Sequence, residues 1–224
     1  MSNQSPIERA VERYSEFHDL RAAINLIPGI GGSLDALFGG LGSEIAQRRV
    51  LHLANTLREE MEQLAESAVD KSFLESEEFR DLSLRAFEAA SRTRHEEKVR
   101  WYAKILRKEV STDGLRDDSA EAYINTLADL TLREILVAQA LWNQQGLAQR
   151  NHGENDLQFA TRMGWENLSD ECPGISPEDL PFCLSRLERA GLVREVVGTF
   201  LDYEGGVFVV TYAFEKLMQN YINS

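Results

Sequence analysis

The sequence is short of several features that would assign it to a particular class of protein. It has only two cysteines among 224 residues, so a disulfide-rich secreted framework is excluded and a reducing compartment is expected. No uninterrupted apolar run reaches the ~20 residues that a membrane-spanning helix needs. The first twenty residues are polar and charged, the opposite of an apolar secretory signal. We therefore expect a cytoplasmic, folded protein.

Positive charge is also scarce. Lys and Arg number 24 against 37 Asp and Glu, which gives a formal net charge of −13 and a pI near 4.8. The chain as a whole therefore lacks the basic surface that nucleic acid requires, and an anionic membrane would repel it. A local basic patch can override the overall charge, so the charge of individual segments also matters.

Known catalytic motifs are absent from the sequence. There is no phosphate-binding G-x-x-x-x-G-K-[ST] loop, and Gly31–Asp35 lacks the final glycine of a nucleophile elbow. His95-Glu96-Glu97 resembles the start of a zinc-protease motif, but Val99 stands where the second histidine is needed. Three further candidate ligands have spacings that fit no short metal motif: His152, Cys172 and Cys183. We predict no enzyme activity, cofactor or metal, with an unfamiliar active site as the remaining alternative.

What is present is an unusual apolar stretch, residues 22–42. It contains one charge, Asp35, together with Pro28 and six glycines. Proline disfavours helical geometry in the residue before it, and Ser33 can cap a new helix beginning at Leu34. The stretch is therefore predicted to be a hairpin of two short helices around Pro28–Gly32.

This hairpin has two interpretations. In the first it is buried, and its glycines let two helices approach closely. In the second it mediates self-association or inserts conditionally into a membrane, although each arm is too short to cross ~30 Å of hydrocarbon alone. The residues that would carry association, with a second copy or another protein as partner, are Leu26, Ile27, Pro28, Gly29, Ile30, Gly31, Gly32, Leu34, Leu37 and Phe38.

Helical periodicity dominates the remainder of the first half. Apolar residues recur every three or four positions from Ser43 to about Val69, and Ser76-Glu77-Glu78 opens another helix. A third helix is predicted from about His95 to Val110, packed on two sides, and a fourth from about Ser119 to Leu130. We predict a helical domain over 1–118 and a second domain over 119–224.

The second domain is predicted to contain helices, one β-hairpin and a closing helix. Thr131 and Glu134 have the spacing of a capping box, and Gly146 stands where a helix should end. The other predicted elements are helices at Asp156–Met163 and from Ser176–Asp179 to Gly191, β-prone runs at Leu192–Leu201 and Val207–Thr211, and a helix at about Tyr212–Ile222. This order resembles a winged helix, which makes the expected fold mainly α with a helical bundle followed by a winged-helix-like domain.

The charge of the second domain opposes DNA binding, the first function that a winged helix suggests. Residues 131–224 contain 7 basic and 13 acidic side chains, and Glu178-Asp179 begin the helix that would read DNA. We therefore expect this domain to contact protein, with a winged-helix transcriptional regulator as the alternative function.

Three segments also resemble uncharacterised bacterial helical proteins, some of which are similar to abortive-infection or phage-defence components. The matching segments are Leu26–Gly32, Glu96–Leu106 and Leu184–Val193. None of them contains a catalytic motif. The resemblance implies an association with defence and no mechanism.

Overall fold

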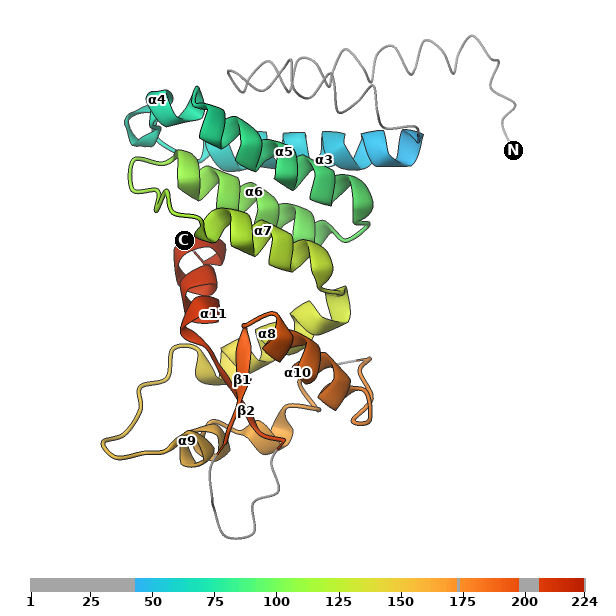
Figure 1. Cartoon of the computed structure of the whole chain (residues 1–224), viewed down its shortest axis with the longest axis vertical. Coiled ribbons are helices and arrows are strands. Elements are labelled where there is room, and N and C mark those ends of the chain that lie inside the picture. Colours follow the sequence, from blue (N-terminus) through green and yellow to red (C-terminus); the bar gives the residue numbers. More distant parts are fainter. Residues whose placement is uncertain (1–42, 173, 198–205, 224) are drawn as a thin grey trace, which may run out of the picture. The chain divides into compact units, whose positions relative to one another are not determined.

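The protein is mainly helical, with one small antiparallel hairpin near its C-terminus, as the sequence predicted. The computed structural model describes residues 43–172, 174–197 and 206–223 (Figure 1). The chain separates into two compact units, Met1–Ala128 and Asp129–Ser224.

The first unit contains four long helices and two short helical turns within its described part. Ser43, Asp70 and Ser76 each accept a hydrogen bond from a backbone N–H of the first turn that follows, which explains where three of the helices begin. The elements are α3 (Glu44–Glu62), η1 (Glu66–Ala68), α4 (Lys71–Leu74), α5 (Glu77–Arg92), α6 (Glu96–Val110) and α7 (Ser119–Asp129).

The core of this unit lies where α3 packs against α5 and α6. Figure 1 shows these helices and α7 running alongside one another. Trp101 and Ile105 on α6 are both buried, which confirms that this helix is packed on two sides. Burying a large apolar side chain stabilises a fold by roughly 1.5–3 kcal/mol. The largest fully buried side chains here are Leu53, Leu57, Phe79, Phe87, Tyr102, Ile105, Leu106 and Ile124.

Helix α3 is shorter than predicted. The helix predicted to reach Val69 ends at Glu62, and Ala65 is extended. The chain leaves the helix because its backbone bonds to the end of α6 instead. Asp70 N donates to Val110 O at 2.9 Å and Thr112 N donates to Ala68 O at 2.8 Å. Long-range backbone hydrogen bonds thus override a helical pattern that continues in the sequence.

The division between the units falls at the end of α7, between Ala128 and Asp129, whereas the predicted domain boundary lies before this helix. The contacts between described residues that hold α7 to the first unit include a hydrogen bond and an ion pair. The buried Lys98 side chain on α6 donates to Ala128 O at 3.2 Å, and Arg85 on α5 lies 3.2 Å from Glu121.

The second unit follows the predicted order of three helices, a hairpin and a closing helix. Its elements are α8 (Leu132–Gln145), α9 (Asp156–Arg162), η2 (Trp165–Asn167), α10 (Leu180–Arg189), β1 (Val193–Glu195), β2 (Phe208–Val210), α11 (Tyr212–Leu217) and η3 (Met218–Ile222, a π-helical turn). The capping box of Thr131 and Glu134 is present, which confirms the predicted start of α8. Helix α10 begins at Leu180, after a turn that starts at Ser176.

The hairpin is completed by a side chain. β1 and β2 pair antiparallel, with Arg194 opposite Val209. The backbone groups of Phe208 and Val210 therefore point away from β1, towards α8. There the buried Gln145 donates to Phe208 O and accepts from Val210 N, both at 3.2 Å. One glutamine amide replaces the neighbouring strand that this edge lacks.

The apolar stretch 22–42, including every predicted association residue from Leu26 to Phe38, lies outside the described residues. Over the helices that are described, none combines the length and the apolar character required to span a membrane.

Candidate interaction site on the second unit

The candidate site in the described part of the chain is the exposed face of α10. One side of this helix carries Cys183, Leu184 and Leu187, which are buried, and the helix packs against α8. The opposite side carries Phe182, Ser185 and Arg189 at three- and four-residue spacing, so these side chains share one exposed stripe. Phe182 is 67% exposed although it is one of the largest apolar side chains in the unit.

A buried carboxylate holds α10 in place. Glu134 is 2% exposed; it accepts from Thr131 N at 2.7 Å and from Arg186 Nε at 3.1 Å. The same guanidinium donates to Asp129 O at 3.0 Å. Arg186 therefore joins α10 to the start of α8, with two of its nitrogens donating within the protein. The exposed stripe is consequently presented by a helix that is anchored on its other side.

The surroundings of Phe182 are acidic. Glu178 and Asp179 precede the helix and are exposed, and Glu188 is exposed near its end. Asp179 lies 3.5 Å from Arg133, an exposed ion pair that contributes little to stability. An exposed aromatic ring can pack into an apolar pocket of a partner, and the carboxylates beside it are complementary to basic groups.

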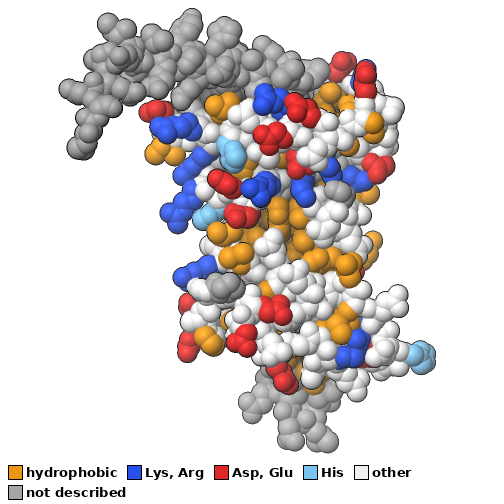
Figure 2. Space-filling model, turned by 180° about the vertical axis from the view of Figure 1, so that it is seen from behind, with side chains coloured by type: hydrophobic (Ala, Val, Ile, Leu, Met, Phe, Trp, Pro, Cys, Tyr) orange, Lys and Arg blue, Asp and Glu red, His pale blue; other side chains and the backbone are white. Residues whose placement is uncertain are grey.

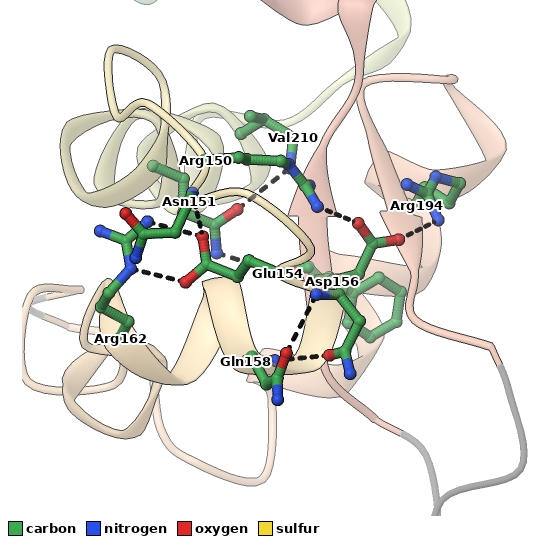
Figure 3. A network of polar contacts seen from close by, with 11 residues as sticks. Arg150, Asn151, Glu154, Asp156, Gln158, Arg162, Arg194 and Val210 are labelled. Carbon is green, nitrogen blue, oxygen red and sulfur yellow. Dashed lines mark hydrogen bonds and ion pairs between the residues drawn. The ribbon is translucent and has the colours of Figure 1, made fainter.

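The arginines on the other side of the unit are paired as well (Figure 3). Arg162 binds Glu154 through two parallel hydrogen bonds, of 2.6 and 2.8 Å, and Glu154 also accepts from Asn151 N at 2.9 Å. The hydrogen bond from Arg162 is the main reason that the pKa of Glu154 falls from 4.5 to about 2. Because the carboxylate is 7% exposed, this pair is an internal clamp between the loop and α9.

Asp156 forms ion pairs with two further arginines. Arg194, on β1, lies 2.8 Å from one carboxylate oxygen, and Arg150 binds the other. Burial raises the pKa of Asp156, but hydrogen bonds from Arg194 and Arg150 outweigh it and leave the pKa below its ordinary value. The guanidinium of Arg150 also stacks 4.4 Å from the ring centroid of Phe159. This network ties α9 to the hairpin.

These contacts neutralise the positive charge of the second unit. At least five of its seven basic side chains form carboxylate ion pairs: Arg133, Arg150, Arg162, Arg186 and Arg194. Phosphate contacts need cations that are free to face the ligand. The described part of this unit therefore offers no basic surface comparable with a DNA-binding face.

The described residues of this unit include no group of three or more His, Cys, Asp or Glu placed to hold a metal ion. The two thiols, Cys172 and Cys183, are buried, and burial raises the pKa of each. Both stay protonated at neutral pH and are poor nucleophiles. Cys183, which the sequence offered as a candidate metal ligand, is a buried thiol on the packed side of α10.

Phe182 was not among the site residues predicted from the sequence. The available signal was that Phe182 falls outside the apolar stripe of its helix, formed by Leu180, Cys183, Leu184 and Leu187. No sequence pattern indicated which arginines form ion pairs, because the carboxylates that they contact lie on other elements of the fold. No protein-family model, curated protein or solved structure matches this chain.

Proposed function

We propose that this is a non-enzymatic interaction protein whose second unit is a winged-helix-like module that binds a protein partner through the exposed face of α10. The observation that carries this proposal is the combination of an exposed Phe182, an acidic surround and paired arginines. The partner's surface would hold an apolar pocket flanked by Lys or Arg. Aromatic residues are the side chains most often found as energetic centres of such interfaces.

Self-association or conditional membrane insertion through residues 22–42 is the second part of the proposal. It rests on the apolar, glycine-rich composition of that stretch in a chain of net charge −13. A role in phage defence belongs to the proposal only through the resemblance of three segments given above.

The experiment for α10 compares two charge substitutions in the full chain, Phe182→Glu and Leu147→Glu. Leu147 is a matched control because it is also exposed, at 78%, in the same unit but away from α10. The chain is produced with a photo-crosslinking residue at Ser185, and crosslinked proteins are identified from cells. We expect a partner that crosslinks in the Leu147→Glu background and is lost with Phe182→Glu. Equal crosslinking in both backgrounds contradicts the proposal.

The 22–42 stretch is tested separately by sedimentation and by flotation with vesicles. The Phe38→Asp substitution is expected to shift the full chain towards the monomer, or to abolish flotation, without altering crosslinking at α10. A wild-type chain that is monomeric at high concentration and does not float at any lipid charge removes this part of the proposal.

The alternative function is a winged-helix transcriptional regulator, which the order of elements in the second unit favours. A gel-shift assay with genomic fragments at low salt distinguishes a transcriptional regulator from a protein-binding module. The paired arginines predict no shift even at low salt, where charge attraction is strongest. Tight binding to particular fragments would support the alternative.

A further inference from the structure

The first unit contains a basic pocket between the start of α3 and the start of α6. Its volume is about 270 Å³, slightly below the ~300–1,000 Å³ of typical small-molecule sites. It would thus hold a small ligand or the end group of a larger one. The lining residues are Ile45, Arg48, Arg49, His52, Thr93, Arg94, His95, Glu96 and Val99.

Cationic side chains exceed anionic ones around this pocket. Arg48, Arg49 and Arg94 line it against a single carboxylate, Glu96, in a chain whose net charge is −13. Two histidines, His52 and His95, add further hydrogen-bonding groups. Figure 2 shows Lys and Arg side chains gathered beside two histidines on one edge of this unit.

The arginines of the pocket are paired less than those of the second unit. Arg48 has an exposed partner, Glu44, at 3.1 Å, and Arg49 donates one N–H to Ser91 O at 3.3 Å. Arg94 makes no ion pair with any described residue, and Glu96 lies 3.9 Å from Arg100, outside the pocket. Like charges held together without counter-charges repel one another. An anion placed between them would relieve that repulsion.

The backbone at the start of α6 also favours an anion in this pocket. His95 is the N-cap of α6, but its side chain makes no capping hydrogen bond, unlike Ser43 and Ser76 on α3 and α5. The first turn of α6, which lines the pocket, therefore receives no side-chain cap from His95, and it lies at the positive end of a 15-residue helix. Oxyanions bind readily at such a position when basic side chains are nearby.

The floor of the pocket is apolar. Val99 is buried there, and Ile45 is 59% exposed at the edge. The site therefore combines donors for an oxyanion with a surface for an organic group. Arginine forks match the geometry of phosphate oxygens, and three of them suit a dianion better than a single carboxylate.

We propose that this pocket binds a phosphate monoester, with Arg48, Arg49 and Arg94 contacting the phosphate and Ile45 and Val99 contacting the organic group. The proposal is independent of α10, since every residue involved belongs to the first unit. The phosphate could belong to a free metabolite or to a lipid headgroup, and the experiment separates these sources.

The test is calorimetric titration of the full chain with phenyl phosphate and with inorganic phosphate. We expect phenyl phosphate to bind with a Kd below about 1 mM and more tightly than inorganic phosphate. The substitution Arg94→Gln should weaken binding ~10-fold or more, because it removes charge-assisted hydrogen bonds. The substitution Ile45→Ser should reduce the preference for phenyl phosphate.

Arg92→Gln is the matched control. Arg92 is exposed and lies two residues from Arg94, but it does not line the pocket, so the same change of net charge should leave the Kd within about 2-fold. Equal weakening by both substitutions would show non-specific charge attraction and overturn the proposal. Absence of binding to wild type at several millimolar phenyl phosphate would also overturn it. Both arginines are exposed, and thermal unfolding without ligand checks that each variant is folded.

The source of the phosphate is settled with vesicles of phosphatidylcholine containing phosphatidic acid. Flotation that is lost with Arg94→Gln and competed by phenyl phosphate assigns the site to a lipid headgroup. Calorimetric binding without flotation assigns it to a free phosphate monoester. Flotation that survives Arg94→Gln in a chain that does not bind phenyl phosphate contradicts the proposal.

Discussion

The strongest quantitative prediction concerns Gln145, whose side chain satisfies the free edge of β2. Replacing it with leucine keeps the size and helix propensity of the side chain nearly unchanged. The substitution removes both hydrogen bonds to the hairpin, the one to Phe208 O and the one from Val210 N. These two backbone groups then remain in the interior without a partner.

The magnitude follows from the burial of each group. A buried polar group left unpaired costs about 1–3 kcal/mol. Phe208 is buried, whereas Val210 is half-buried, so water partly compensates its N–H. The two losses together come to roughly 2–4 kcal/mol, and the better burial of leucine offsets about 1 kcal/mol of this. We expect Gln145→Leu to lower the free energy of unfolding of the second unit by about 1–3 kcal/mol.

The adjacent residue supplies a matched control. The Gln144 side-chain amide is buried, and it has no hydrogen-bond partner among the described residues. Burying a polar group without a partner is unfavourable, so Gln144→Leu should leave stability unchanged or raise it by about 1 kcal/mol. The same substitution at neighbouring positions of α8 is therefore expected to have opposite effects.

Urea unfolding of both full-length variants, followed by tryptophan fluorescence, measures the difference. Trp142 and Trp165 lie in the second unit and report its unfolding. In a unit of this size 1 kcal/mol corresponds to a shift in Tm of about 4–8 °C, which thermal scans resolve. Hydrogen exchange should also show faster exchange of the Val210 amide in Gln145→Leu. The reasoning is refuted if Gln145→Leu is as stable as Gln144→Leu.

Two further predictions concern the second unit. Gly146→Ala should lower the free energy of unfolding by about 1–3 kcal/mol, because the added methyl would overlap the Trp142 ring, which packs on Phe214. Gly146 is the C-cap of α8 and has helical φ and ψ, so helix propensity alone predicts a gain of up to ~1 kcal/mol, and the sign of the change in urea unfolding tests the packing. For Glu154, the folded pKa of about 2 lies below the ordinary 4.5, so its contribution is present above about pH 4.5 and is lost as pH falls towards 2. The stability difference between wild type and Glu154→Gln should therefore shrink over that range, and a difference that is constant with pH would contradict the Arg162 pairing.

The positions where most helices begin were predictable because they depend on residues close together in the sequence. Ser76 caps α5, and the Thr131–Glu134 box caps α8, each over a span of three residues. The hairpin near the C-terminus was also recognisable from two β-prone runs separated by glycines. The described strands are Val193–Glu195 and Phe208–Val210, and part of the first predicted run lies outside the described residues.

Other features required the tertiary structure. The sequence shows seven basic residues in 131–224 but cannot show that five of them are paired, because their carboxylates lie on other elements or beyond a loop. The end of α3 was missed for the same reason, since its continuation bonds to the end of α6.

The sequence by itself determined the helical class, most helix starts, the acidic character and the apolar stretch 22–42. All of these follow from composition or from interactions within one or two turns of chain. Only the tertiary structure brought Gln145 to the edge of β2, exposed Phe182 on an anchored helix and assembled the pocket from Arg48, Arg49 and Arg94. These arrangements join residues far apart in the chain, and packing against other elements decides which side chains meet.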